Sequence, residues 1–319
     1  MKFGFSAPFR GPLANPQDIR TIAEAAERFG YDTITVADHI VVPSNISANY
    51  PYSEDGEFAW TADGSTDCME QFTLLAWLGA VTTSVRLLTS VIVVPHRNPL
   101  FMAKSLATTD QLSGGRVTVG CGAGWMREEF EALNITDFDA RGKVTDEYIQ
   151  VMKELWTKGR ASFHGEFIDF TDAAADPKPV QQPHPPIWIG GESMPAIRRT
   201  AALGDTWYPF GSNPKFRMDT IETFVARRDK LFTEAERLDR DPTSIGLAYN
   251  CAFHNEEAQT HIDGGRLLFT GSPEERAEDI AQLEAAGVST MIVNVTSNDL
   301  AHMLERVERF SSDVMALLN

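Results

Sequence analysis

The sequence predicts an α/β fold, a (β/α)8 TIM barrel with insertions. Apolar β-type runs alternate with helical patterns along most of the 319 residues, and eight such runs are each followed by a helical pattern. Strands buried on both faces of a parallel sheet form continuous apolar runs, and strands that alternate with helices indicate βα units. The strands expected are Lys2–Ser6, Thr33–Ala37, Arg86–Val94, Arg116–Gly120, Ile187–Gly190, Thr206–Phe210, Ser244–Asn250 and Thr290–Val295.

Start and stop signals frame several of the intervening helices. An Asn-Pro pair begins two of them, at residues 15–16 and 98–99, and glycines end them at residue 30 and at residues 114–115. Asn caps the first turn, and Pro is tolerated at the first helical position because it has no backbone N–H that would be left unpaired. The segment SPEE at residues 272–275 forms a capping box for a third helix that ends at Gly287. A last helix is expected from about Leu300 to Leu317.

Two stretches are longer than a minimal barrel needs, and we expect both to be insertions in a single domain spanning residues 1–319. Residues 41–67 are polar and rich in Pro, Tyr, Ser and Asp. They follow the second strand and so belong to the face that carries barrel active sites. Residues 159–186 contain the hairpin-like SFHGEFIDF and then a proline-rich stretch. We interpret that stretch as a stiff loop, because the βα rhythm resumes at once with PIWIGG.

Composition and charge exclude several classes of function. The net charge is −17 and no basic run exists, which argues against a nucleic-acid partner and against an anionic membrane surface. No apolar run approaches the length needed to cross a bilayer, and the N-terminus reads directly as a strand, so a cytoplasmic protein is expected. The three cysteines, Cys68, Cys121 and Cys251, are scattered, which predicts reduced thiols and no metal site.

The segment VTVGCGAGWMREEF, residues 117–130, can be interpreted in two ways. A dinucleotide-binding loop requires a third glycine where Trp125 stands, and it belongs near the start of the fold rather than at a fourth strand. In a barrel, the same glycines would let the backbone at a strand end approach a flat ring or a phosphate. Glycines that serve only a tight turn are the alternative. Glu128 and Glu129 are either a charged first helical turn, or one of them faces the pocket.

The second strand ends in Asp38-His39, two ionisable residues after a largely apolar run. Burying such a pair is costly unless the groups are paired or functional, and the carboxyl end of a barrel strand is where catalytic residues lie. A histidine there can donate or accept a proton near neutral pH. The alternative is that Asp38 caps the loop backbone and His39 only packs.

Two further predicted strands contain residues that are unusual in a buried strand. Thr89-Ser90 interrupts a run of β-branched residues, either as a bulge toward the barrel mouth or as hydroxyls that bind neighbouring strands. The strand in PIWIGGES ends in two glycines, and Ser193 is a plausible N-cap for a helix from about Met194. Free N–H groups at that helix start suit a phosphate, unless the segment is an ordinary turn. Arg198 and Arg199, further along the helix, are expected to be solvated.

Together these motifs resemble one family, the bacterial-luciferase-like flavin and deazaflavin oxidoreductases. The similarity runs from KFGFSAPF through TITVADHIVVP and the specific block RNPLFMAKSLATTDQLSGGRVTVGCGAGW to GSPEERAEDIAQLEAAGVSTMIV. The resemblance implies a barrel that holds an isoalloxazine-type ring at its carboxyl-terminal mouth. The segments DHIVVPSNISANYPYSEDGEF and GAGWMREEF look most like the branch that uses the deazaflavin coenzyme F420.

The resemblance also assigns roles to individual residues. In such relatives the Asp-His pair sits against the ring, which implies catalytic roles for Asp38 and His39. A cis peptide bond backs the ring, and the matching bond here is Ser90–Val91. Glu128 is implied to be catalytic at the substrate edge. The other positions implied to bind the cofactor are Gly122, Ala123, Gly124, Trp125, Gly190, Gly191, Glu192 and Ser193.

The function expected is hydride transfer between C5 of coenzyme F420 and a small organic substrate. His39 would exchange a proton with the substrate, and Asp38 would orient His39. Arg127 and Lys178 are candidates to bind the anionic tail of the coenzyme. Sugar-phosphate dehydrogenases of the branch carry a catalytic Glu where Trp125 stands, so a more apolar or aromatic substrate is expected.

The alternatives are an FMN-dependent monooxygenase and a barrel that only carries the cofactor. Dimers are common in such barrels, and a homodimer is expected.

Overall fold

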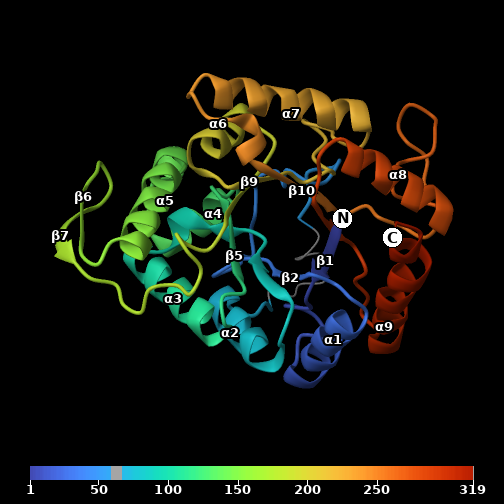
Figure 1. Cartoon of the computed structure of the whole chain (residues 1–319), viewed down its shortest axis with the longest axis horizontal. Helices are drawn as coiled ribbons and strands as arrows, with labels where there is room; N and C mark the ends of the chain where they lie inside the picture. Colours follow the sequence, from blue (N-terminus) through green and yellow to red (C-terminus); the bar gives the residue numbers. More distant parts are fainter. Residues whose placement is uncertain (59–66, 319) are drawn as a thin grey trace.

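A computed structural model, which describes residues 1–58 and 67–318, confirms the barrel. Figure 1 shows its strands at the centre of a ring of helices. The strands are β1 (Lys2–Ser6), β2 (Thr33–Val36), β3 (Arg86–Thr89), β4 (Ile92–Val93), β5 (Val117–Gly122), β8 (Ile187–Gly190), β9 (Thr206–Tyr208), β10 (Gly246–Cys251) and β11 (Thr290–Val293). They are parallel in the order β3-β2-β1-β11-β10-β9-β8-β5-β4, and the sheet closes because β5 also pairs with β3.

The helices lie outside this sheet and begin and end largely at the predicted signals. They are α1 (Pro16–Arg28), α2 (Gln71–Val81), α3 (Pro99–Leu112), α4 (Arg127–Leu133), α5 (Arg141–Thr157), α6 (Met194–Leu203), α7 (Ile221–Glu236), α8 (Pro273–Ala285) and α9 (Leu300–Arg309). The Asn15 side chain accepts a hydrogen bond from the N–H of Asp18, and the Ser272–Glu275 capping box is formed in both directions.

Two layers of apolar side chains hold the barrel together. The larger layer lies between strands and helices and includes the fully buried Ile34, Leu75 and Ile280. A smaller cluster fills the inside of the barrel, so that the inside is a packed core rather than a channel. Its members are Leu88, Tyr208, Ala248 and Ile292, with Val91 and Trp188 packed against them.

The third strand differs from the continuous run that the sequence predicted over residues 86–94. It divides into β3 and β4 at the Ser90–Val91 bond, which is cis. The two halves contact different stretches of β5, because Leu87 pairs with Val117 and Ile92 pairs with Cys121. The cis bond thus lies at the position that the resemblance implied, at the carboxyl end of β3.

The last helix is also shorter than predicted. Its α-helical part ends at Arg309, and one π-helical turn (Phe310–Val314) and a 3-10 turn (Met315–Leu318) follow. The wider turn keeps Phe310 and Val314 buried against the core, where Phe310 contacts the ring of Phe3 edge-on. Packing of these apolar side chains therefore overrides the regular helical repeat.

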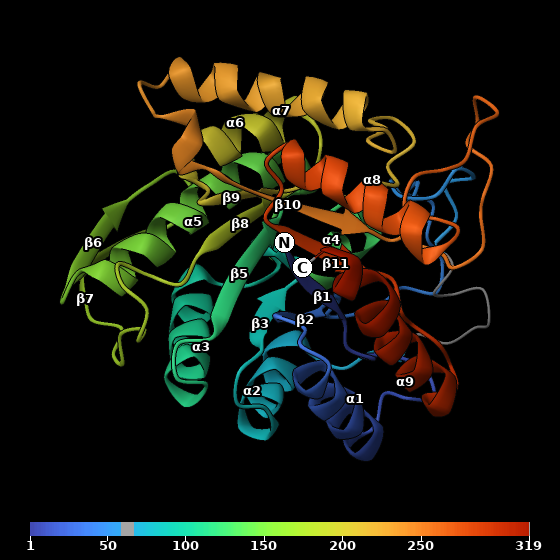
Figure 2. The same ribbon diagram turned by 45° about the vertical axis from the view of Figure 1, so that its right-hand side comes forward.

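Both expected insertions leave the barrel pattern. The first expected insertion, residues 41–67, is described up to residue 58, and residues 59–66 lie outside the described residues. The second begins with the antiparallel strands β6 (Ala161–His164) and β7 (Asp169–Ala173), as the sequence predicted. Figure 2 shows this hairpin outside α5. The Glu147 carboxylate of α5 accepts the N–H groups of residues 166–168 and so holds the hairpin turn.

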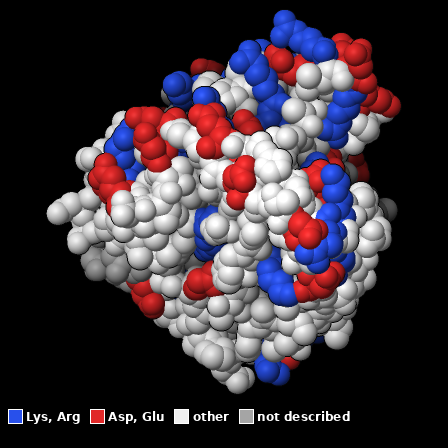
Figure 3. All heavy atoms as spheres, turned by 90° about the vertical axis from the view of Figure 1, so that its left-hand side faces the viewer, with Lys and Arg blue, Asp and Glu red and all other residues white. Residues whose placement is uncertain are grey.

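On one face of the molecule, charges of both signs are mixed rather than separated (Figure 3). On the face shown in Figure 3, acidic and basic side chains are interspersed, although the chain carries a net charge of −17. Within residues 1–58 and 67–318, no helix combines the length and the apolar character that spanning a membrane requires.

Arg116 joins three segments at the amino end of the barrel. It precedes β5, and its guanidinium donates to the carbonyl oxygens of Gly79 and Thr82 at 2.9 Å and of Val85 at 2.8 Å. Its Nε also donates to the carbonyl of Ser113 at 2.8 Å. One side chain therefore satisfies carbonyls at the end of α2, at the start of β3 and after α3.

Replacing Arg116 with Ala is expected to lower the free energy of unfolding by about 2–4 kcal/mol, because several carbonyls lose a charged donor. Urea denaturation followed by circular dichroism measures the change. Arg237→Ala is the matched control, because the Arg237 side chain is 67% exposed and pairs with Glu234 at 3.1 Å. That variant is expected to change stability by less than about 0.5 kcal/mol. Equal losses in the two variants would contradict the role of Arg116.

Candidate active site

The carboxyl ends of the barrel strands form one rim, here called the barrel mouth, and it gathers most of the residues that the sequence singled out. Asp38 and His39 follow β2, and Ser90–Val91 separates β3 from β4. Residues 122–125 end and follow β5, and residues 190–193 end and follow β8. Parallel strands that close into a barrel bring all of these segments to the same face.

Val91 lies at the floor of the mouth, between two glycines. A Cβ atom added to Gly122 would lie 2.5 Å from Cγ2 of Val91, and one added to Gly190 would lie 3.0 Å from its Cγ1. Gly124 has a φ of +83°, and a Cβ there would lie 2.7 Å from both Phe130 and Val93. The chain itself thus requires these glycines, whether or not a ligand approaches them.

Neutral polar groups flank this floor. The Ser90 hydroxyl lies 2.9 Å from the Tyr208 hydroxyl, which also accepts from Nδ2 of Asn250 at 2.8 Å. Burial raises the pKa of Tyr208 to about 12, so the phenol stays protonated at neutral pH. The Thr89 hydroxyl donates to the carbonyl of Gly120 at 2.9 Å. Thr89 therefore binds the neighbouring strand β5, whereas Ser90, which precedes the cis bond, contacts β9, a strand that is not its neighbour in the sheet.

Asp38 does not orient His39 as the sequence suggested. Its carboxylate is buried, 4% exposed, and accepts two hydrogen bonds of 2.7 Å from the Arg97 guanidinium and one of 2.8 Å from the N–H of Val93. Asp38 and His39 follow the end of β2 and have different partners, Arg97 for Asp38 and Glu129 for His39. Asp38 holds the segment that follows the cis bond.

The carboxylate that contacts His39 belongs to Glu129 of α4. His39 Nδ1 and Glu129 Oε2 are 2.7 Å apart, and the side chains are only 8% and 1% exposed. The other oxygen, Oε1, accepts the N–H groups of Ile40 at 2.8 Å and Val41 at 3.3 Å. Of the two glutamates left open by the sequence, Glu129 is the one that faces the site.

Glu128, expected to be catalytic, has different contacts. Its Oε1 accepts from the N–H and the hydroxyl of Ser47, at 2.7 and 2.6 Å, and from the N–H of Ala48 at 3.1 Å. Neighbouring residues on a helix point about 100° apart. Glu128 therefore reaches the insertion loop, residues 41–58, whereas Glu129 reaches the mouth.

His96 is a residue that the sequence interpretation missed. It is buried beside Phe130, and its Nδ1 lies 3.8 Å from Oε1 of Glu129. Neither ring nitrogen has a hydrogen-bond partner among the described residues. Burial lowers the pKa of His96 to about 4, so the ring is neutral at physiological pH. No motif marked this histidine, because its place beside Glu129 depends on the fold.

Aromatic side chains of the insertion loop cover the mouth. The rings of Tyr50 and Phe58 each lie 5.1 Å from Trp125, and Phe58 lies 5.4 Å from His39. Burial raises the pKa of Tyr50 to about 12. Tyr52 packs on Phe210, whose segment follows β9, at 4.6 Å. The insertion loop thus places an apolar layer around His39 that limits access of water.

The turn between β8 and α6 contains a buried acid. Glu192 accepts the N–H of Phe210 and Nδ2 of Asn213, both at 2.7 Å, and burial raises its pKa to about 7. Ser193 is the N-cap of α6, as predicted, and its hydroxyl accepts from the N–H of Ala196 at 3.5 Å. The turn is thereby tied to the segment after β9.

Two basic residues, Arg199 and Lys178, differ from the expectations, whereas the role expected of Arg127 stays a prediction. Arg199, predicted to be solvated, is buried and pairs with Asp146 of α5, because α6 packs against α5. Lys178 donates to the carbonyl of Leu155, near the carboxyl end of α5 and so at the opposite end of the barrel from the mouth. Arg127 pairs with Asp139 at 2.7 Å on the surface.

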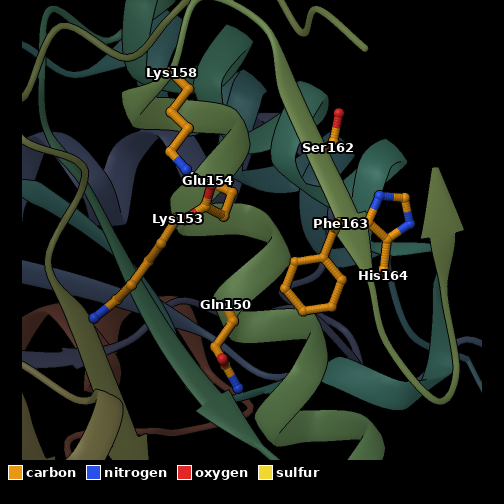
Figure 4. A pocket seen from close by; sticks show the side chains of 7 residues that line it. All are labelled: Gln150, Lys153, Glu154, Lys158, Ser162, Phe163 and His164. Atoms are coloured by element: carbon orange, nitrogen blue, oxygen red, sulfur yellow. Dashed lines mark ion pairs between the residues drawn. The ribbon is translucent and has the colours of Figure 1, made fainter. Parts of the chain in front are cut away.

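A hollow outside the barrel, between α5 and β6, offers no comparable chemistry. In Figure 4, Phe163 points toward α5, whereas Lys153 points away from β6. Lys153 donates to the carbonyl of Leu203 at 2.6 Å, and Lys158 pairs with Glu154. These cations are already engaged, so we place the candidate active site at the mouth.

Comparisons with known proteins show the family of this chain. Residues 1–261 match the family model described as luciferase-like monooxygenase. An uncharacterized protein of Mycobacterium tuberculosis is 37% identical over 214 residues, which is 67% of this chain and 71% of that protein. The FMNH2-dependent dimethylsulfone monooxygenase of Pseudomonas putida is 27% identical over 343 aligned positions, which is 94% of this chain and 87% of the enzyme.

A solved structure gives the same picture of the fold. The F420-dependent secondary alcohol dehydrogenase, in complex with an F420-acetone adduct, superposes with a TM-score of 0.74 at 19% identity, over 100% of this chain and 99% of that chain. The family match covers most of the sequence, including β1 to β10 and every segment of the mouth named above. The chain therefore belongs to the luciferase-like monooxygenase family.

Proposed function

We propose that this protein is an oxidoreductase that uses coenzyme F420 and transfers a hydride between C5 of the deazaflavin and a small organic substrate. The observation that carries the proposal is an imidazole, His39, held by the buried carboxylate of Glu129 at the mouth of the barrel. Such a group can exchange a proton where charge develops on a substrate. The fold shared with an F420-dependent alcohol dehydrogenase supports the choice of coenzyme.

The residues at the mouth fit a flat tricyclic ring. Val91 offers an apolar floor between Gly122 and Gly190, which carry no side chains that would stand above it. Ser90 and Tyr208 supply neutral hydroxyls at its edge. We propose that Ser90, Val91 and the segment 122–125 hold the ring, and that the turn 190–193 holds the phosphate through N–H groups at the start of α6. When bound, the deazaflavin supplies or accepts the hydride.

His39 supplies the matching proton. A carbonyl that gains a hydride needs a proton on its oxygen, and an alcohol that loses a hydride must release one. Because Nδ1 of His39 contacts Glu129, we propose Nε2 as the nitrogen that exchanges the proton with the substrate. The aromatic layer of Tyr50, Phe58 and Trp125 keeps bulk water from this exchange and favours an apolar substrate.

A second candidate is an FMN-dependent monooxygenase. The relative from Pseudomonas putida, which uses FMNH2, aligns with 94% of this chain, and that observation favours FMN. The two cofactors place a similar ring at the same mouth, but they support different reaction classes, because the deazaflavin does not activate oxygen. The cofactor therefore decides the reaction.

Titration of the purified protein distinguishes the two cofactors. Coenzyme F420 is expected to quench the tryptophan fluorescence of the protein and to bind at least about tenfold more tightly than FMN, a difference of about 1.4 kcal/mol. Isothermal titration calorimetry with each cofactor provides the affinities. Tighter binding of FMN, together with oxygen consumption when it is reduced, would support the monooxygenase instead.

Replacing His39 with Ala is expected to lower kcat by about 10²–10⁴-fold while changing cofactor affinity much less, because the residue handles a proton rather than the ring. Turnover and cofactor affinity are measured separately. His164→Ala serves as the control, because His164 lies exposed in the distant hairpin. Full turnover in the His39 variant would remove this residue from the mechanism.

Glu192 predicts a specific dependence of stability on pH. Its folded pKa of about 7 lies above the ordinary value of 4.5, so the native state binds the proton more tightly than the unfolded state does. The contribution of Glu192 to the free energy of unfolding is present below about pH 4.5 and is lost as the pH rises through about 7. The loss is on the order of 3 kcal/mol in all.

A protonated Glu192 is also compatible with a phosphate at the same turn, whereas an ionised one would repel it. The melting temperature of Glu192→Gln relative to wild type is expected to rise between about pH 5 and pH 8, because the variant lacks the ionisation. Scanning calorimetry across this range measures the difference. A constant difference would show that Glu192 does not titrate there.

A further inference from the structure

We propose that Glu129 is the positioning residue of this site: its carboxylate holds the ring of His39 through Nδ1 and fixes a proton on that nitrogen. The inference rests on the proton exchange proposed for His39. It assigns to Glu129 a role for which neither Asp38 nor Glu128 is placed.

The first step is the chemistry of the contact. The 2.7 Å contact between Oε2 and Nδ1 of His39 is a hydrogen bond, and with Oε2 as the acceptor, as Oε1 is for its two N–H groups, the proton lies on Nδ1. Glu129 is 1% exposed and therefore depends on its protein partners to offset the loss of hydration. It has a proton donor on each oxygen, His39 on one and the N–H groups of Ile40 and Val41 on the other.

The second step is that the charged neighbours do not compete for this position. Arg97 donates both terminal nitrogens to Asp38 and also contacts Glu70. His96 lies 3.8 Å from Glu129, beyond hydrogen-bond distance, and is neutral. Of the cationic or titratable groups described around Glu129, His39 is the one that shares a proton with it. Cys68 approaches only the backbone of His39, where its thiol donates to the carbonyl at 3.6 Å.

The third step concerns glutamine, whose side chain has the shape of glutamate but carries an amide. The N–H groups of Ile40 and Val41 need an acceptor, so the single oxygen of a glutamine at position 129 would stay with them. Its NH2 group would then face Nδ1 of His39 and donate to it. Nδ1 would then be the acceptor, and the proton of the ring would lie on Nε2. A change of one atom in Glu129→Gln thus inverts the tautomer while the shape is kept.

Nitrogen NMR of the histidine rings tests this directly, on protein without cofactor and without reference to turnover. The His39 signals are identified by their loss in His39→Ala. We expect the Nδ1–H tautomer in the wild type and the Nε2–H tautomer in Glu129→Gln. A wild-type His39 with its proton on Nε2 would overturn the inference, even if the variant did not fold. An unchanged tautomer in a folded Glu129→Gln would overturn it as well.

Turnover gives the second readout, and Glu147→Gln is the matched control. The Glu147 carboxylate also accepts three backbone N–H groups, but at the turn of the hairpin outside the barrel. We expect turnover to fall by about 10²-fold in Glu129→Gln, as for loss of a correctly protonated general acid or base. The control is expected to change neither turnover nor the His39 tautomer.

The two proposals fail in different ways. If His39→Ala keeps full turnover while Glu129→Gln inverts the tautomer, the proposed function of His39 is wrong and the positioning of its proton is without consequence for the reaction. If His39→Ala loses turnover but Glu129→Gln keeps both turnover and tautomer, the proposed function stands and the inference about Glu129 is overturned.

Discussion

The pairing of β5 with β3, which closes the sheet, is the constraint on which the site depends. Once the parallel strands form a closed ring, every strand delivers its carboxyl end to one rim. His39 and Glu129 are 90 residues apart in the chain and approach to 2.7 Å there. The barrel supplies rigid positions, and the segments after the strands supply the chemistry.

Carboxylates that accept loop N–H groups are a recurring device in this acidic chain. Glu27 accepts from residues 83–85 before β3, and Glu147 accepts from residues 166–168 in the hairpin. Partial burial alone would raise the pKa of Glu27, but the amide hydrogen bonds outweigh it and lower the pKa to about 2. Glu128 and Glu129 hold the insertion loop in the same way. Part of the negative charge therefore serves to order loops.

Local patterns in the sequence predicted much of the fold and the outline of the site. Apolar runs and caps placed the eight barrel strands and most of the helices, because those signals are carried by neighbouring residues. The position of the cis bond at Ser90–Val91 followed from the family resemblance rather than from propensity. The expected homodimer and the residue roles remain predictions.

The partners of individual side chains could not be predicted in the same way. Whether Glu128 or Glu129 faces His39 depends on the rotation of α4, and the burial of Arg199 depends on how α6 packs on α5. Both depend on packing between elements that are distant in the sequence, and such packing leaves no pattern among neighbouring residues. The separation of Asp38 from His39 has the same origin, since it is Arg97, from beyond β4, that engages Asp38.

The placement of Val91 between Gly122 and Gly190 has an evolutionary consequence. These residues come from three different strands or strand ends, yet they share one small volume. A methyl group gained at Gly122 would clash with Val91 at 2.5 Å, and one gained at Gly190 would press on it at 3.0 Å, so the size of the side chain at each position limits the other two. Homologues with a larger side chain at one of these positions should therefore have a smaller one at another. A library that randomises one position alone will contain mostly variants whose side chains clash there.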